Sequence, residues 1–431
     1  MDWELGTRGD DVLTTGNADT AFGVWQGGED SVTGGDGNDL INFVDKFNAG
    51  DTVDGGNGID TLRLAGDYSD GVTMTATTLV NVENIQLGVG HDYYLTSNDA
   101  TVAAGATLTV NAEALGAGDT VTFDGSAETD GAFRFIGGLG ANAFTGGAGN
   151  DHFYLTKGGD AAVHGGGGND TFYMGDTLDG SDAIDGGAGN DVVDITGNGD
   201  GNPDALVLVA TSFTSVETLR LENFAVYDIT TVDANVASGA WLTVDGTRIG
   251  NRSLTFDGSA ETDGHFHIIA AGGDDVITGG ALNDIIDLSR GGDGFDGSDT
   301  VTGGGGADHI IAGYANGSVD TFIYNAASDS TGADYDVIRN VDFSADVFTV
   351  PWGNIGPVTV VGGGSISHAS FVADVTALGA SLGVHGAQEF TATSGDLAGH
   401  SFLIIDVNGT VGYQSGQDIV IDVTGFSNLS I

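Results

Sequence analysis

Aspartate recurs in this sequence at a fixed distance from pairs of glycines, in a nonapeptide G-G-x-G-x-D-x-U-x whose U is a large apolar residue. Carboxylate oxygens are the ligands that hard cations prefer, and Ca²⁺ takes about six to eight oxygens. Glycine turns can aim backbone carbonyls at the same ion. The pattern therefore predicts cation binding in which neighbouring turns share each ion. The six full copies are GGDGNDLIN from Gly34, GGNGIDTLR from Gly55, GGAGNDHFY from Gly146, GGGGNDTFY from Gly165, GGAGNDVVD from Gly186 and GGGGADHII from Gly303.

The predicted metal ligands lie at positions one, three, four and six of each repeat. The position-six carboxylates of the full copies are Asp39, Asp60, Asp151, Asp170, Asp191 and Asp308. The residues at positions one, three and four are Gly34, Asp36, Gly37, Gly55, Asn57, Gly58, Gly146, Ala148, Gly149, Gly165, Gly167, Gly168, Gly186, Ala188, Gly189, Gly303, Gly305 and Gly306. Degenerate copies start at Gly6, Gly137, Ala270 and Gly279, and they add Asp11, Asp275 and Asp284 as predicted ligands.

Composition agrees with a cation as the partner. The chain has 431 residues and a formal net charge of −52, from 10 Lys and Arg against 62 Asp and Glu. This charge would repel nucleic acid and anionic lipid, and it opposes compaction unless counter-ions sit among the carboxylates. Cysteine is absent, which excludes disulfides and thiolate metal sites. The 76 glycines occur with only three prolines, so they are expected to serve turns.

The loops must be held by short strands, because the apolar U residue follows two positions after each aspartate. We expect these residues to point into a thin core between two sheets; they are Ile41, Leu62, Phe153, Phe172, Val193 and Ile310. Two nonapeptides would then form one turn of a right-handed parallel roll whose layers are about 4.8 Å apart. Helix signals are nearly absent, so the predicted class is all-β.

A longer duplication lies above the nonapeptide period. TFDGSAETDG occurs from Thr122 and again from Thr255, each time before a repeat cluster, and VENIQL from Val82 parallels VETLRL from Val216. Alternating Thr, Val, Leu and Phe in these segments indicate short strands. From about Ser318 strand-like runs replace the repeats, with one short helix expected from Ser370 to Leu378. The expected organisation is a repeat block at 1–64, a β-rich segment at 65–136, a repeat block at 137–194, a β-rich segment at 195–269, a repeat block at 270–316 and a C-terminal β domain at 317–431.

The nonapeptides resemble those of the RTX family of secreted calcium-binding proteins. The resemblance implies Ca²⁺-bound parallel β-roll blocks holding several ions, interleaved here with the β-rich segments. The run from Asp320 also resembles the C-terminal β domain of serralysin-type metalloproteases. In that family an uncleaved type I secretion signal lies at the C-terminus, which would implicate the type I secretion machinery as a partner.

Export by another route than a signal peptide is expected, since the N-terminal residues lack its basic and apolar regions. No apolar run approaches the roughly 18 residues of a membrane span. The expected location is therefore extracellular, either secreted or attached to the outer cell surface.

Catalytic motifs are each incomplete, which predicts that the chain is not an enzyme. None of the nine histidines lies in H-E-x-x-H. The stretch 363–367 lacks the last glycine of an esterase elbow. His265 and His267 suit a transition-metal pair, although an exposed strand is the preferred interpretation. Arg8-Gly9-Asp10 could suggest cell attachment, and the pairs Asp10-Asp11 and Asp274-Asp275 could suggest glycosidase carboxylates. All fall on repeat positions that calcium binding explains.

The predicted function is a structural, surface-layer-like or adhesive one, with folding on extracellular Ca²⁺. Self-association or a cell-surface polysaccharide would be its partner. The alternative is the non-catalytic part, or a relative, of a secreted RTX enzyme such as a serralysin-type metalloprotease, a lipase or an alginate epimerase.

Overall fold

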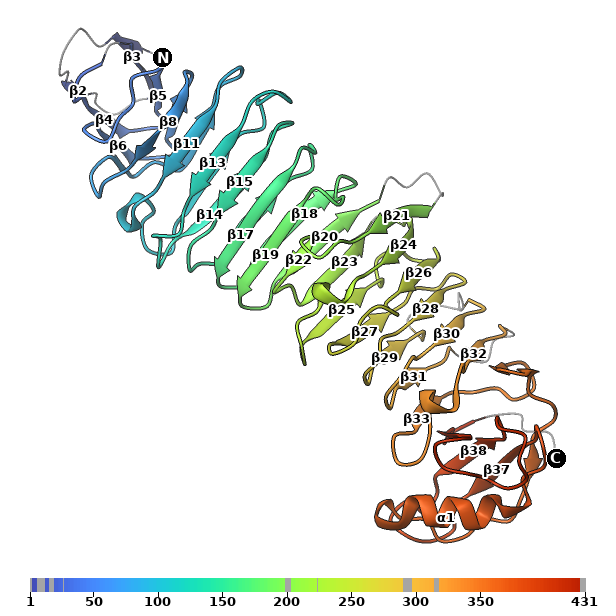
Figure 1. Cartoon of the computed structure of the whole chain (residues 1–431). Coiled ribbons are helices and arrows are strands. Elements are labelled where there is room, and N and C mark those ends of the chain that lie inside the picture. The colour runs from blue at the N-terminus through green and yellow to red at the C-terminus, as the bar shows by residue number, and fades with distance from the viewer. Residues whose placement is uncertain are drawn as a thin grey trace. The chain divides into compact units, whose positions relative to one another are not determined.

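The computed structural model describes residues 2–5, 12–14, 19–25, 27–197, 203–222, 224–289, 297–313 and 318–426. Two compact units divide the chain. Unit 1 comprises Met1–Ile195 with Thr211–Thr218, and unit 2 comprises Thr196–Ala210 with Leu219–Ile431. Each unit contains parallel strands stacked in register, which Figure 1 shows in blue to green for unit 1 and in green to orange for unit 2.

Unit 1 is a stack of coils, and each coil contributes a strand to each of two faces. The first face is one parallel ladder in the order β1 (Asp2–Leu5), β3 (Thr20–Val24), β5 (Leu40–Phe43), β7 (Thr61–Leu64), β10 (Asn84–Leu87), β12 (Thr107–Asn111), β14 (Ala132–Ile136), β16 (His152–Tyr154), β18 (Thr171–Gly175) and β20 (Val192–Thr196).

The second face of unit 1 consists of two shorter parallel ladders. One runs β2 (Val12–Thr14), β4 (Ser31–Asp36), β6 (Thr52–Asn57) and β9 (Leu79–Val80). The other runs β8 (Tyr68–Thr73), β11 (Tyr93–Thr96), β13 (Val121–Asp124), β15 (Asn142–Thr145), β17 (Ala161–Gly167), β19 (Ala183–Ala188) and β22 (Phe213–Thr214).

The core between these faces is a column of aligned apolar side chains, because strand register places the same position of each coil above the last. The fully buried column is Phe22, Ile41, Leu62, Ile85, Val110, Phe135, Phe153, Phe172 and Val193. The Phe153 and Phe172 rings stack with centroids 4.6 Å apart. The predicted inward direction of the U residues is thus confirmed, and Ile310 of unit 2 is buried as well.

The β-rich segment at 65–136 belongs to the same stack. Its strands β10, β12 and β14 continue the ladder between β7 and β16 without interruption. Alternating apolar residues suffice to build such a coil, so the nonapeptide loop is not required for the strand itself.

Unit 2 repeats this construction. Its first face runs β25 (Trp241–Asp245), β27 (His265–Ile269), β29 (Ile285–Asp287), β31 (His309–Ile311) and β33 (Asp336–Arg339), and the unit also holds β23 (Thr218–Glu222). Its second face runs β21 (Pro203–Val207), β24 (Val226–Thr230), β26 (Leu254–Asp257), β28 (Val276–Thr278), β30 (Thr300–Thr302), β32 (Thr321–Ile323) and β34 (Val347–Val350), where β35 (Gly353–Asn354) turns back antiparallel. The coils therefore continue beyond residue 316.

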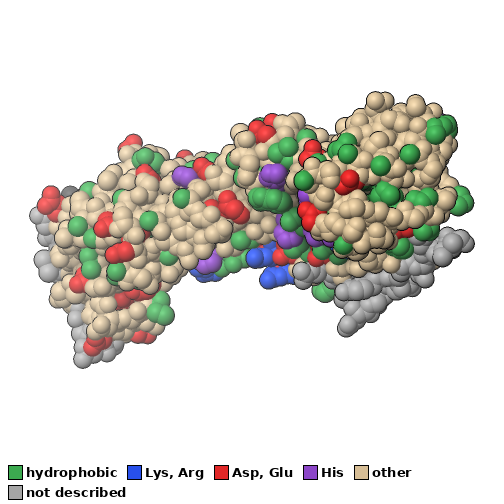
Figure 2. All heavy atoms as spheres, turned by 90° about the horizontal axis from the view of Figure 1, so that it is seen from below, with side chains coloured by type: hydrophobic (Ala, Val, Ile, Leu, Met, Phe, Trp, Pro, Cys, Tyr) green, Lys and Arg blue, Asp and Glu red, His purple; other side chains and the backbone are tan. Residues whose placement is uncertain are grey.

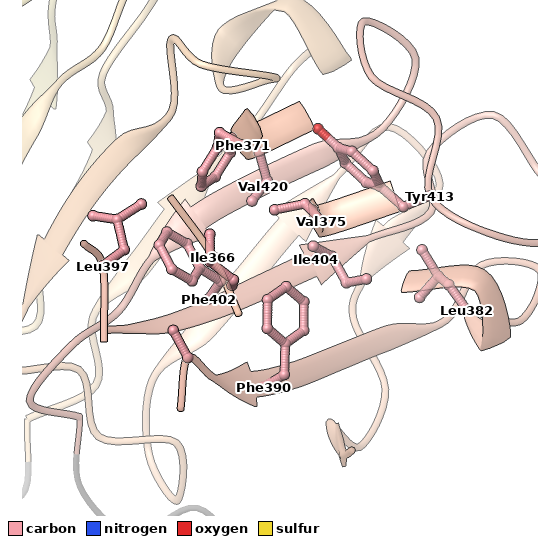
Figure 3. Packing of buried hydrophobic residues seen from close by; sticks show 11 residues of the cluster. Ile366, Phe371, Val375, Leu382, Phe390, Leu397, Phe402, Ile404, Tyr413 and Val420 are labelled. Carbon is pink, nitrogen blue, oxygen red and sulfur yellow. The ribbon is translucent and has the colours of Figure 1, made fainter. Parts of the chain in front are cut away.

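A C-terminal cap, residues 359–426, follows the last coil. It contains β36 (Thr359–Val360), β37 (Ala387–Thr391), β38 (Ser401–Ile405) and β39 (Ile419–Asp422), with β37, β38 and β39 antiparallel and β39 parallel to β33. Helix α1 (Phe371–Leu378) confirms the short helix predicted there. Its Phe371 and Val375 pack with Phe390, Phe402 and Ile404 in the cap's own apolar cluster (Figure 3).

The fold is thus the predicted all-β parallel roll, with α1 as the one α-helix of the described residues. Short 3₁₀ turns lie at η1 (Asp99–Thr101), η2 (Asp233–Asn235), η3 (Ala327–Asp329), η4 (His368–Ser370) and η5 (Gly379–Ser381). No helix in the described ranges is long and apolar enough to cross a membrane. On the face in Figure 2, acidic side chains are scattered over several patches and basic ones are few.

Candidate calcium sites

In five of the six full copies, those from Gly34, Gly55, Gly165, Gly186 and Gly303, the turns require glycine at positions two and four because of backbone conformation; Gly147 and Gly149 of the copy from Gly146 do not have a positive φ. The φ angles at these positions lie between 94° and 154° at Gly35, Gly37, Gly56, Gly58, Gly166, Gly168, Gly187, Gly189, Gly304 and Gly306. Side chains with a Cβ rarely adopt such angles. The turn geometry is therefore set by the repeat sequence itself.

Position one requires glycine for a different reason, namely the close approach of oxygen atoms. A Cβ placed on Gly165 would lie 2.2 Å from Asp170 Oδ2 and 2.4 Å from the carbonyl oxygen of Gly186 in the next coil. The position-six Oδ2 lies 2.1 to 2.6 Å from the same point at Gly34, Gly55, Gly146, Gly186, Gly279 and Gly303. A carboxylate oxygen and a carbonyl oxygen from adjacent coils thus converge beside each of these glycines except Gly303, beside which lies the Asp308 carboxylate.

The position-six aspartates form a row along each unit, which we call the first carboxylate row. The Oδ1 atom of each aspartate accepts a hydrogen bond from a backbone N–H one coil earlier; Asp170 Oδ1 accepts from Asp151 N at 2.7 Å, and Asp191 Oδ1 from Asp170 N at 2.7 Å. Asp39, Asp60, Asp151, Asp284 and Asp308 bond in the same way to Thr20, Asp39, Phe133, Phe266 and Asp284. All seven carboxylates are at most 2% exposed.

The second oxygen of most of these carboxylates has no partner among the described residues. Oδ2 is buried without a hydrogen bond in Asp39, Asp60, Asp170, Asp191 and Asp308. A buried carboxylate oxygen that is left unpaired costs several kcal/mol by order of magnitude, so such groups are normally paired or bound to metal. The carboxylate and carbonyl oxygens that converge beside position one fit a hard cation such as Ca²⁺.

The pKa values of the row reflect this arrangement. Burial, together with the charges of Asp151 and Asp191, raises the pKa of Asp170 to about 8. Burial and the charges of Asp39, Glu83 and Asp54 raise the pKa of Asp60 to about 6. The roll therefore holds like charges close together, and a divalent cation between coils would neutralise them.

Asp151 and Asp284 differ from the other members. Their Oδ2 atoms accept from Gly147 N at 2.8 Å and from Gly280 N at 2.7 Å, so both carboxylates are fully hydrogen-bonded within the chain. They occupy corresponding places, as the duplication implies, at the first coil after each TFDGSAETDG segment.

The remaining predicted ligands fall into three groups. Asp11 lies outside the described residues. The position-three residues Asp36, Asn57, Ala148 and Ala188 are exposed, and Asp36 Oδ1 accepts from Asn57 Nδ2 at 2.8 Å. Asp275 is buried, but it belongs to the opposite corner of the coil, where its Oδ1 accepts from Leu254 N at 2.7 Å.

Asp275 belongs to a second row of buried aspartates, which the sequence analysis did not predict and which we call the second carboxylate row. Asp299 Oδ1 accepts from Asp275 N, and Asp51 and Asp182 make the equivalent bonds to Asp30 N and Ala161 N. A usable signal exists, because a buried aspartate stands four residues before the glycine pair at Asp30, Asp51, Asp182 and Asp299. The ends of the first row were also missed: Glu83 Oε2 accepts from Asp60 N, and Glu217 Oε2 from Asp191 N, both at 2.7 Å.

The roll and its rows of buried carboxylates define a calcium-binding repeat protein. The family model for the RTX calcium-binding nonapeptide repeat matches four stretches, residues 26–43, 134–162, 267–295 and 293–316. The chain carries RTX-type nonapeptide repeats, and these repeats imply that it binds Ca²⁺. A search of curated proteins finds no match to it.

Proposed function

We propose that this RTX-type chain is a secreted structural protein, with a surface-layer-like or adhesive role and no catalytic activity, which folds when it meets extracellular Ca²⁺. The observation that carries the proposal is the first carboxylate row. Its unpaired buried oxygens repel one another in a calcium-poor cytosol and bind the ion outside the cell. At about 100-fold excess over a site Kd of roughly 10⁻⁴ M, each ion contributes about 2.7 kcal/mol.

A structural role agrees with how the acidic residues are used. The buried carboxylates of both rows take part in coil-to-coil hydrogen bonds, so their position is explained by stacking rather than by a reaction. Exposed acidic side chains would let calcium bridge neighbouring copies or a cell-surface polysaccharide.

Calcium titration tests folding and assembly together. Circular dichroism is expected to show β structure appearing with calcium, and light scattering is expected to rise at millimolar calcium and fall after chelation. A chain that stays strictly monomeric at high concentration in calcium, or that hydrolyses protein, lipid or polysaccharide after purification, would contradict the proposed role.

Export is proposed to use a type I signal in the last segment of the chain. Truncation after Gly399 is expected to leave the protein inside the cell. Because this truncation also removes β38 and β39, the matched control is the full chain with Phe402→Ala and Ile404→Ala, which damages the cap core but keeps the segment. Secretion of the truncated chain would place the signal elsewhere, and retention of the control would mean that cap damage, rather than loss of a signal, blocks export of the truncated chain.

A further inference from the structure

The two TFDGSAETDG segments each bury a glutamate that lies outside the nonapeptide pattern. Glu128 and Glu261 are 1% and 0% exposed. Glu261 Oε1 accepts from the backbone N–H of Thr262, Asp263 and Gly264 at 3.0, 3.0 and 2.7 Å. The other oxygen, Oε2, is buried and has no hydrogen-bond partner.

Two further carboxylates lie beside Glu261. Ligand oxygens of Asp233, Glu261 and Asp263 all lie within 4.8 Å of one another. Asp233 comes from η2 in the preceding coil, and its Oδ1 accepts from Thr262 N at 2.9 Å and Thr262 Oγ1 at 2.6 Å. These bonds fix the exposed carboxylate of Asp233 next to the loop that carries the buried one.

Among the residues that the structure describes, the trio makes no ion pair. Within the described ranges, no Lys, Arg or His forms an ion pair with Asp233, Glu261 or Asp263. Carboxylates at this spacing repel one another, and the repulsion is strongest for a buried member that is screened least by solvent. A cation bound among the three carboxylates would remove this repulsion, including that on the buried Glu261, whose Oε2 makes no hydrogen bond among the described residues.

We propose that Asp233, Glu261 and Asp263 form a Ca²⁺ site outside the nonapeptide repeats. The donors are all carboxylate oxygens, which favours a hard cation over a transition metal. Two of the three residues are exposed, so water completes the coordination shell and the ion can enter from solvent. The proposal does not depend on the structural role proposed above.

The first copy of the duplication carries the same residue types in the corresponding loop. Asp99 Oδ1 accepts from Thr129 N at 3.0 Å and Thr129 Oγ1 at 2.6 Å, and Glu128 Oε1 accepts from Asp130 N and Gly131 N. Glu128 Oε2 is likewise buried without a partner. The loop therefore recurs in both copies. The Ca²⁺ site is proposed in the second copy, where Asp233, Glu261 and Asp263 converge.

The number of bound ions tests the site. Equilibrium dialysis of the full chain against Ca²⁺, followed by metal analysis, is expected to find one ion fewer per chain in the double variant Asp233→Asn, Asp263→Asn than in the unmodified protein. Circular dichroism in saturating calcium is expected to be unchanged, because both residues are exposed. Glu261→Gln is expected to lose the same ion. If this buried change prevents folding, the double variant Asp233→Asn, Asp263→Asn still tests the site.

Asp245→Asn is the matched control, because Asp245 Oδ1 accepts from Thr247 N at 3.0 Å and Thr247 Oγ1 at 2.6 Å without belonging to the trio. It is expected to keep the full number of ions. A double variant that binds as many ions as the unmodified chain, or that fails to fold in saturating calcium, would overturn the assignment, as would loss of an ion from the control.

Discussion

Buried carboxylates occur both in the nonapeptide coils and in the C-terminal cap, but their oxygens are satisfied differently. In the coils, Asp170 and Asp191 each keep one buried oxygen without a partner. In the cap, both oxygens of Asp418 accept backbone N–H groups, Oδ1 from Val407 at 3.0 Å and Oδ2 from Gln414 at 2.8 Å. The cap supplies its own partners, whereas the coils leave room for an external cation. Folding of the coils should therefore depend on calcium, and folding of the cap should depend on its apolar cluster.

Removing calcium should produce the largest difference in stability between the coils and the cap. In excess chelator, we expect the coils to lose protection from hydrogen exchange, because the first carboxylate row is then uncompensated. The strands β37 and β38 of the cap should keep theirs. Hydrogen exchange with mass spectrometry on the full chain measures both, and Mg²⁺ should restore little because it sheds water reluctantly. Coils that stay protected in excess chelator would show that their folding does not depend on calcium.

Substituting one buried aspartate in each region should affect stability differently. Asp170→Asn removes a charged ligand, and we expect a loss of about 2.7 kcal/mol of stability at calcium 100-fold above Kd. Without calcium the same change should be neutral or favourable, because it relieves repulsion by Asp151 and Asp191. Asp418→Asn should instead cost about 1–3 kcal/mol at every calcium concentration, because the amide replaces an acceptor.

Denaturant unfolding of both variants, with and without calcium, provides the measurement. An Asp170→Asn effect that is the same in the presence and absence of calcium would argue against metal binding at that carboxylate.

Crowding at position one should give a smaller effect. Gly165→Ala would place its Cβ 2.2 Å from Asp170 Oδ2, so the carboxylate or the next coil must shift, at a cost of about 1–3 kcal/mol. Gly118→Ala is the control, since its Cβ would meet nothing within 4 Å. The calcium midpoint of the folding transition should rise for the first variant alone. Equal midpoints for both would mean that the close approach at Gly165 is not needed for the site.

The parts of the molecule that follow a strict local rule could be predicted from the sequence. The U residues and position-six aspartates occupy fixed places in a nonapeptide, so the buried positions of Phe153 and Asp170 followed from the period. The glycine requirement was also predictable, since φ at Gly166 and Gly168 is 102° and 103°.

Other features depend on stacking and could not be predicted in the same way. Glu83 and Glu217 end the first row because their coils lie next to Asp60 and Asp191, which no local pattern states. Asp275 falls in a degenerate repeat, yet the register of β28 with β26 and β30 assigns it to the second row. Asp151 accepts from Gly147 N, so its second oxygen is satisfied although its repeat matches fully.

The smallest expected effect is a difference in pH response between coils and cap. Burial is the main cause that raises the pKa of Asp170 from 3.8 to about 8, so the folded coil binds a proton more tightly than the unfolded chain does. The stability this contributes is fully present below pH 3.8 and is lost as the pH rises to about 8. The pKa of Asp422 in the cap shifts in the opposite direction. Burial raises it, but hydrogen bonds from Thr424 and His400 lower it by more, so the net pKa is depressed. Its contribution is present at neutral pH and is lost only on strong acidification.

A calcium-free chain, prepared by dialysis, should therefore gain β circular dichroism when the pH falls from 8 to 5, because protons replace the missing cation at the first row. The gain should be partial, since a proton neutralises a carboxylate but does not bridge two coils. Asp170→Asn should reduce the change by removing one titrating group, whereas Asp422→Asn should leave it unaltered, because the pKa of Asp422 is depressed. If the β signal of the calcium-free chain is flat or falls over this range, the buried oxygens of the coils are already compensated, and the contrast with the cap has another origin.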